Sequence, residues 1–188
     1  MNTYTDLIKR IQDLLDQKKQ AAVSIDGPCG SGKSTLAEFL RGQFPGSAVI
    51  HADDFFLQPF QRTPQRMDEP GGNMDRERLQ LEVLECLPKD RPFFYQRYDC
   101  QSGIMTPAEV QPSQLYIIEG AYSQHPDLSK YYDLKIFLEV DEQTQLQRLR
   151  QRVPAEKMDA FLQKWIPLEQ HYFSAFNIKE NSDFMLSA

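Results

Sequence analysis

A glycine-rich segment of the sequence has the residue types that bind a chain of phosphates. It matches the pattern G-x-x-x-x-G-K-[ST] in full, with the residues Gly27-Pro28-Cys29-Gly30-Ser31-Gly32-Lys33-Ser34. Glycines let the backbone curl so that successive N–H groups point at phosphate oxygens, and the N-terminus of a following helix adds partial positive charge. Lys33 would neutralise charge on the β- and γ-phosphates, while the Ser34 hydroxyl would coordinate Mg²⁺. We predict a nucleotide-binding loop whose phosphate contacts come from Gly27, Gly30, Ser31, Gly32, Lys33, Ser34 and Thr35.

Two carboxylates follow apolar runs that are typical of buried strands. Asp53 comes shortly after Ala48-Val49-Ile50, and Glu119 directly after Tyr116-Ile117-Ile118. Ligands bind at the carboxyl ends of the strands in open α/β sheets, so both acids are predicted to face one site. Asp53 would orient an acceptor hydroxyl and take its proton, and Glu119 would hold a Mg²⁺-bound water. A turn or helix cap is an alternative role for Asp53, and equally for its neighbour Asp54.

The elements that must position these groups alternate between strand and helix. Apolar runs predict strands over Ala21–Asp26, 47–51, 115–118 and 134–140, with a short further one over 184–186. Helical spacing predicts helices over 7–15, 36–40, 76–87 and 155–176, the last interrupted at Pro167. Pro and Gly residues predict a long loop over 55–74, and a Ser-Gly turn predicts a short hairpin over 93–105. The alternation predicts an α/β fold with a parallel sheet covered on both faces.

Length and composition indicate a single globular domain over residues 1–188. The chain is 40% hydrophobic and 26% charged, as is ordinary for such proteins. Its net charge of -6 argues against a nucleic-acid partner, because phosphate binding needs a basic surface. No apolar run approaches the ~20 residues that span a bilayer, so no membrane partner is expected. Three scattered cysteines fit neither a disulfide framework nor a zinc site and favour a cytoplasmic location, whereas the oligomeric state is not indicated.

Several other conspicuous side chains are predicted to be structural. His51 falls inside an apolar strand, and His125 and His171 have no second histidine or cysteine at metal-ligand spacing. Trp165 and Tyr172 recur at helical spacing, which is typical of core residues more often than of a base-stacking platform.

A set of segments occurs in the order found in uridine kinases. The segments are 27–35, Ala52-Asp53-Asp54-Phe55-Phe56, Tyr98-Asp99, Ile118-Glu119-Gly120 and Asp133-Leu134-Lys135-Ile136-Phe137-Leu138. The chain therefore resembles the uridine kinase family over most of residues 21–153. It shares part of the pattern with nicotinamide riboside kinase, phosphoribulokinase and bacterial pantothenate kinase. After Tyr98-Asp99 the chain continues Cys100-Gln101-Ser102-Gly103, where uridine kinases usually carry a histidine that helps read the pyrimidine.

The resemblance implies a fold, a donor and several site residues. The implied fold is a three-layer P-loop NTPase, nucleoside-kinase-like, with a mostly parallel central sheet flanked by helices and a small lid. The implied donor is Mg-ATP, so ATP and Mg²⁺ are the expected cofactors, with Asp53 as the base. Asp75 resembles the family's acidic residue that contacts ribose hydroxyls. Phe56 and Tyr98 adjoin the acidic residues and are predicted to contact the acceptor.

The family's lid carries arginines in the pattern R-R-x-x-R-D, which Arg148, Arg150 and Arg152 match loosely. An arginine there could reach over the transferring phosphate and offset charge in the transition state, so we predict catalytic roles for Arg148 and Arg152. A solvated helix face is the alternative, because this spacing splits the three residues across different sides of a helix.

The predicted function is that of an enzyme, a uridine kinase-like phosphotransferase with an alcohol group as acceptor. It would transfer the γ-phosphoryl group of Mg-ATP to a hydroxyl of a nucleoside or nucleoside-like metabolite. A non-nucleoside acceptor such as pantothenate or a sugar is the alternative within this class. A GTPase is disfavoured because the sequence has no N-K-x-D segment. A non-catalytic nucleotide-binding module is disfavoured because Lys33, Ser34, Asp53 and Glu119 are all present.

Overall fold

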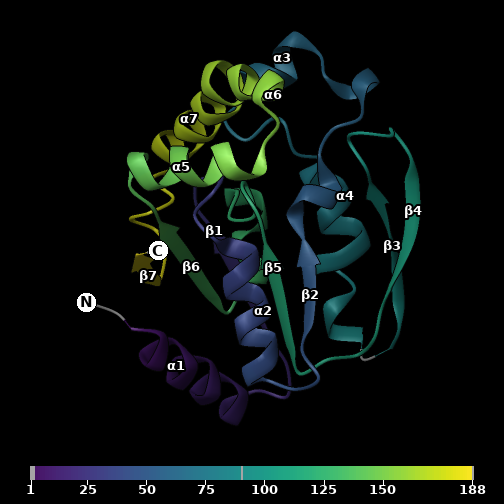
Figure 1. Ribbon diagram of the computed structural model, residues 1–188. Helices are drawn as coiled ribbons and strands as arrows, with labels where there is room; N and C mark the ends of the chain where they lie inside the picture. Colours follow the sequence, from purple (N-terminus) through teal and green to yellow (C-terminus); the bar gives the residue numbers. More distant parts are fainter. Residues whose placement is uncertain (1–2, 90, 188) are drawn as a thin grey trace.

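A five-stranded parallel sheet forms the centre of the molecule in the computed structural model, which describes residues 3–89 and 91–187 (Figure 1). The strand order is β2-β5-β1-β6-β7, and every neighbouring pair is parallel. The strands are β1 (Ala21–Asp26), β2 (Ala48–His51), β5 (Leu115–Glu119), β6 (Leu134–Glu139) and β7 (Phe184–Ser187). The predicted mostly parallel sheet is thus confirmed, including its short last strand.

Helices flank this sheet and follow the strands in the predicted alternation. The α-helices are α1 (Tyr4–Gln17), α2 (Lys33–Gln43), α3 (Pro64–Asp68), α4 (Arg76–Leu79), α5 (Glu142–Arg152), α6 (Ala155–Ala160) and α7 (Ile166–Phe176). Short 3₁₀ turns cover Ala52–Phe55, Pro59–Gln61, Leu87–Lys89 and Pro126–Tyr131, and π turns cover Gln80–Leu84 and Phe161–Trp165. No helix among the described residues has both the length and the apolar character needed to cross a membrane.

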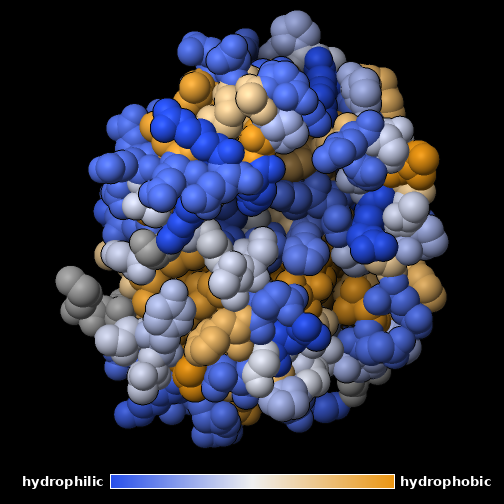
Figure 2. Space-filling view, viewed as in Figure 1, coloured by the Kyte–Doolittle hydropathy of each residue, from blue (hydrophilic) through white to orange (hydrophobic). Residues whose placement is uncertain are grey.

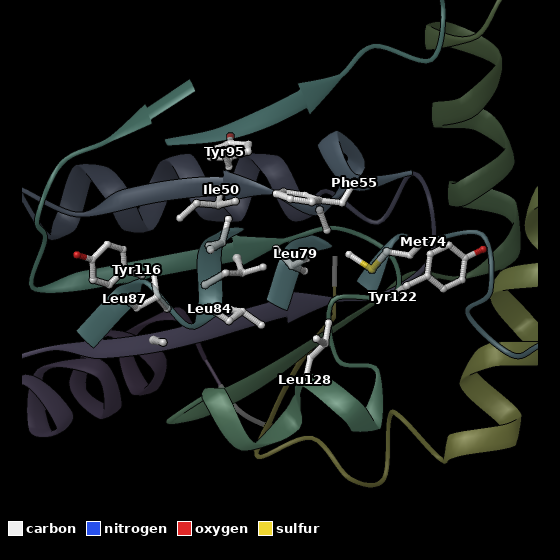
Figure 3. Close-up of a cluster of buried hydrophobic side chains, with 14 of the residues drawn as sticks. Ile50, Phe55, Met74, Leu79, Leu84, Leu87, Tyr95, Tyr116, Tyr122 and Leu128 are labelled. Carbon is white, nitrogen blue, oxygen red and sulfur yellow. The ribbon is translucent and has the colours of Figure 1, made fainter. Parts of the chain in front are cut away.

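The two faces of the sheet are covered by separate hydrophobic clusters. Side chains alternate between the faces of a strand, so Leu115 and Ile117 of β5 join one cluster and Tyr116 and Ile118 join the other. The first cluster includes the buried faces of α1 and α2. The second includes α4, the π turn after it and α7, and Figure 3 shows part of it. The inner strands β1 and β5 are buried along their whole length, and the result is the expected three-layer α/β architecture.

Two predicted segments differ in detail from the structure. The hairpin is longer than expected, with β3 (Phe93–Tyr98) paired antiparallel to β4 (Met105–Val110). The long helix expected over 155–176 is divided by the π turn at Phe161–Trp165, and Pro167 lies in the first turn of α7. Proline removes a backbone donor and is tolerated at the start of a helix, so the interruption precedes it.

Arg66 is one of the residues that order the loop expected over 55–74. Arg66 donates from Nε to the Gly72 carbonyl at 3.1 Å and from Nη2 to the Met74 carbonyl at 2.8 Å. Short helical turns at Pro59–Gln61 and α3 lie within this segment.

On the face shown in Figure 2, hydrophilic side chains predominate, with smaller hydrophobic areas between them.

Candidate functional site

The glycine-rich loop connects β1 to α2 and closes around the lysine that was predicted to bind phosphate. Lys33 Nζ donates to the carbonyls of Gly27 at 2.7 Å and Pro28 at 2.9 Å. Gly27 has φ +144°, and a Cβ there would lie 2.3 Å from the Leu138 carbonyl oxygen, so only glycine fits. Two carbonyl oxygens of the loop therefore position the ammonium group of Lys33.

The loop residues fit a phosphate group. Ser31 Oγ is buried and has no hydrogen-bond partner, so a hydroxyl donor is available inside the loop. Gly32 provides no side-chain cap for α2, which leaves the first N–H groups of the helix open. Free N–H groups at a helix N-terminus together with a lysine form an anion site.

Ser34 and Glu119 meet at the position predicted for the metal. Ser34 Oγ donates to Glu119 Oε1 at 3.0 Å, and His51 Nδ1 lies 2.5 Å from the same oxygen. The hydrogen bond to Glu119 raises the pKa of His51, although partial burial opposes the shift. No group of three or more His, Cys, Asp or Glu side chains within the described ranges could hold a metal. One hydroxyl and one carboxylate suit Mg²⁺, which takes hard oxygen ligands and keeps phosphate oxygens and waters in its shell.

Asp53 lies beside this pair, in the 3₁₀ turn that follows β2. A Cβ on Gly120 would approach Ala52 Cβ to 2.7 Å and Asp53 Oδ1 to 3.2 Å, so the glycine after β5 makes room for the carboxylate. Asp53 is exposed at the cavity, but the protein packed around its carboxylate desolvates it and raises its pKa; the positive charge of Lys33 opposes the shift, and the negative charge of Glu119 adds to it. A carboxylate with a raised pKa is a better proton acceptor.

A cavity of about 830 Å³ brings most of the predicted residues together. The predicted residues that line it are Gly30, Gly32, Lys33, Ser34, Thr35, Asp53, Phe56, Glu119 and Arg152. A second cavity of about 740 Å³ shares several of these and adds Ser31 and Arg148 together with Tyr4, Leu36, Phe39 and Leu138. The phosphate loop thus separates two spaces, one with the acids and one with an apolar wall.

The two lid arginines occupy different places. Arg148 Nη1 donates to the carbonyls of Gly30 at 3.2 Å and Ser31 at 3.3 Å, so this side chain braces the phosphate loop. Arg152 lines both cavities. Of the two arginines, Arg152 is therefore the one that borders both spaces.

Two residues predicted to contact the acceptor do not line either cavity. The carboxylate of Asp75 accepts from the Arg78 backbone N–H at 3.1 Å and from Gln61 Nε2 at 2.7 Å, so it caps α4. Tyr98 is 5% exposed at the end of β3. Their contact with an acceptor stays a prediction.

Helix α7 supplies site residues that the sequence did not indicate. Glu169 Oε2 accepts from the Cys29 backbone N–H at 2.9 Å, and the Tyr172 hydroxyl donates to Asp26 Oδ2 at 2.8 Å. Burial raises the pKa of Asp26 to about 6, against the hydrogen bonds from neighbouring N–H groups. Trp165, predicted to be a core residue, lines the larger cavity. Only the spacing of these residues on one helix could have indicated that they act together.

Tyr122 is a further residue missed from the sequence. It lines the larger cavity, its side chain is almost fully buried, and its φ of 72° is unusual for a non-glycine residue. Its ring packs edge to face on Tyr172, with centroids 5.1 Å apart. In Figure 3 its hydroxyl points away from the hydrophobic cluster. Backbone strain of this kind clusters at functional sites.

Sequence comparisons connect the chain to nucleoside kinases and to longer proteins. No protein-family model matches it. It is 30% identical over 185 residues to the tRNA-specific adenosine deaminase subunit tad2 of Schizosaccharomyces pombe. The aligned region covers 91% of this chain and 45% of that protein. It is 28% identical over 134 residues to uridine kinase of Clostridium perfringens, covering 66% of the chain and 64% of that enzyme. The chain thus spans less than two thirds of each of these relatives.

Solved kinase structures share the whole fold. A possible uridine kinase from Bacillus stearothermophilus has a TM-score of 0.68 and 21% identity, covering 96% of this chain and 99% of that chain. A candidate fructose transport system kinase from Silicibacter has a TM-score of 0.70 and 24% identity, covering 99% and 100%. D-glycerate 3-kinase from Cryptococcus neoformans has a TM-score of 0.64 and 14% identity, covering 97% and 94%. The P-loop fold expected from the sequence is confirmed.

Proposed function

We propose that this chain, a uridine kinase-like P-loop kinase by sequence similarity and fold, transfers the γ-phosphoryl group of Mg-ATP to a hydroxyl of a small metabolite. The sequence resemblance puts a nucleoside or nucleoside-like acceptor first. Pantothenate and sugars are the alternatives. The larger cavity, at about 830 Å³, has room for both transferring phosphate and a small acceptor.

One observation carries the proposal: the base, the phosphate-binding lysine and the predicted metal ligands line the same cavity. Asp53, Lys33 and the Ser34–Glu119 pair come from three different strand ends. A nucleotide-binding module without catalysis would not need a carboxylate with a raised pKa beside the lysine.

The residues of the chain divide the work between donor and acceptor. When a phosphate binds, Lys33 Nζ donates a hydrogen bond to it, either in addition to or in place of its bonds to the Gly27 and Pro28 carbonyls. The open N–H groups at the start of α2 bind further phosphate oxygens. Ser34 and Glu119 would hold Mg²⁺, which supplies neutralisation of charge on the phosphates. Asp53 accepts a hydrogen bond from the acceptor hydroxyl, orients its oxygen toward the phosphorus and takes the proton as the new O–P bond forms. Arg152 offsets the negative charge of the transferring group.

The test is ADP release from Mg-ATP with a panel of uridine, cytidine, nicotinamide riboside, pantothenate and simple sugars. Asp53→Asn keeps the shape of the side chain and removes its basicity, so acceptor-dependent turnover should fall about 10²- to 10⁴-fold. Asp54→Asn is the matched control, because Asp54 accepts a hydrogen bond from the Tyr95 hydroxyl at 2.8 Å and does not line the cavity. Equal turnover in wild type and Asp53→Asn would contradict the assignment of the base.

A further inference from the structure

Four arginines lie between the end of β2 and the end of α4, and three of them pair with carboxylates. Arg66 pairs with Glu77 at 2.7 Å, Arg76 pairs with Asp127 at 3.0 Å, and Arg78 lies 3.5 Å from Glu82 and 3.6 Å from Asp75. Arg62 has no ion pair among the residues that the structure describes. It is also the only one of these four arginines that lines the larger cavity.

Arg62 is held in place by the buried backbone of Leu57. Its Nε donates to the Leu57 carbonyl at 3.0 Å, and the Cys100 thiol also interacts with the guanidinium, which has further terminal N–H groups for a ligand. The Leu57 N–H donates in turn to the Asn73 carbonyl at 3.0 Å. Leu57 is 2% exposed, so one rigid residue positions both Arg62 and Asn73. A guanidinium fixed at Nε is preorganised to bind a carboxylate or phosphate through its two remaining corners.

Asn73 presents an unused hydrogen-bond acceptor at the same cavity. Asn73 is 7% exposed, and its Oδ1 is buried with no hydrogen-bond partner in the described part of the chain. Buried amide oxygens are rarely left unpaired, because the lost hydration is not replaced. A ligand whose hydroxyl or N–H donates a hydrogen bond to Asn73 Oδ1 would give this oxygen its missing partner.

We infer that the acceptor carries an anionic oxyacid group, a carboxylate or a phosphate, which Arg62 binds, and a hydroxyl or N–H that Asn73 Oδ1 accepts. This inference rests on the proposed kinase function and narrows its acceptor. It favours an acidic metabolite over a neutral nucleoside. Arg152 is a poorer candidate for the same anion, since it lines the second cavity as well and lies next to the phosphate loop.

The first measurement is acceptor binding by calorimetry to the protein saturated with Mg-ADP. Three matched pairs serve as probes: glycerate and glycerol, pantothenate and pantothenol, ribose 5-phosphate and ribose. At least one acid should bind about ten- to a hundredfold more tightly than its neutral counterpart, as charge-assisted hydrogen bonds to a fixed arginine require. Whether the pair that responds carries a carboxylate or a phosphate identifies the anion.

Variants of Arg62 then connect the preference to this residue. Arg62→Gln should remove the preference for the acid and leave the neutral probe unaffected, while Arg62→Lys should retain part of it because the charge remains. Arg41→Gln is the matched control, since Arg41 pairs with Glu38 on the exposed surface of α2. The affinity for ATP should be the same in all four proteins.

Three results would overturn the inference: no acid binding more tightly than its neutral counterpart, equal preference in wild type and Arg62→Gln, or a weakened affinity for ATP in Arg62→Gln. The last would assign Arg62 to the donor. If a neutral acceptor is phosphorylated and no acid binds more tightly than its neutral counterpart, the proposed kinase function stands and only the anionic acceptor is rejected. Binding of an acid through Arg62 without turnover of any probe would instead reject the kinase activity toward that acid.

Discussion

His125 is expected to make the folded state sensitive to mild acid. Its side chain is buried, its ring lies 4.9 Å from that of Phe176 and 6.4 Å from that of Tyr172, and its Nδ1 accepts from the Asp127 N–H at 3.3 Å. Burial lowers the pKa of His125 to about 4, and the nearby positive charge of Arg76 adds to the effect. An imidazolium at this position would be desolvated and would lose its acceptor function.

The sign follows from comparing the folded and unfolded states. The unfolded chain binds a proton at His125 near pH 6.5, and the folded chain does so only near pH 4. A depressed pKa means that the stabilisation is complete above pH 6.5 and is lost as the pH falls toward 4. Between pH 7.5 and 5 the free energy of unfolding should fall by about 2 kcal/mol through this residue alone, and by about 3 kcal/mol below pH 4.

Urea unfolding at several pH values measures this loss when wild type is compared with His125→Asn. Asparagine still accepts from the Asp127 N–H but does not titrate, so the variant should be less stable at pH 7.5 and lose less stability toward pH 5. The gap between the two proteins should narrow by about 2 kcal/mol over this range. Asp26, whose pKa is raised to about 6, increases the free energy of unfolding on acidification. This contribution is the same in both proteins and cancels in the difference between them.

Parallel loss of stability in the two proteins would refute this reasoning. It would mean that His125 takes up its proton in the folded state as readily as in the unfolded chain. A gap that widens toward pH 5 would reverse the sign, and it would show that the Asp127 carboxylate, 3.5 Å from His125 Nδ1, outweighs the desolvation of the imidazolium.

Two further predictions concern packing and the lid. Gly72→Ala should destabilise the fold by about 3 kcal/mol in urea unfolding, because its Cβ would lie 1.8 Å from the Arg66 carbonyl oxygen. Gly42→Ala, whose Cβ meets no atom within 4 Å, should instead stabilise α2 by about 1 kcal/mol; equal effects would contradict the packing argument. Arg152→Gln should lower kcat about a hundredfold, since Arg152 lines both cavities, whereas Arg148→Gln should mainly raise KM for ATP by loosening the phosphate loop. Indistinguishable kinetic changes in the two variants would argue against this division of roles.

The parts of the site that were predictable depend on local sequence or on strand ends. The phosphate loop is a continuous motif, so its glycines and Lys33 were identifiable without knowledge of the fold. Asp53 and Glu119 come from separate segments, but each follows a buried strand, and parallel strands end at one edge of the sheet. In the structure both acids line one cavity together with the loop, and their roles there stay a prediction.

The part of the cavity that we propose for the acceptor was not predictable from the sequence, because it depends on which side chains pair with one another in the folded chain. Arg62 and Arg66 are the same residue type four positions apart, and only the structure distinguishes the one with a carboxylate partner from the one without. Asp75 was expected to contact the acceptor by resemblance, but in the structure its carboxylate is engaged by Gln61 and by the first turn of α4. The sequence shows how many charged side chains a loop contains, but it does not show which of them form ion pairs in the folded chain.

Helix α7 explains why the phosphate loop and the acceptor wall have a fixed relation. Tyr172 and Glu169 lie one turn apart and contact Asp26 and Cys29, at the two sides of the first loop glycine. Trp165, one turn earlier, lines the cavity. Residues at this spacing share one face of a helix, so α7 and the π turn before it form a rigid link from the base of the loop to the wall of the larger cavity. The position of the glycine-rich loop therefore depends on a helix about 140 residues away in the sequence, and the phosphoryl transfer that we propose would depend on it as well.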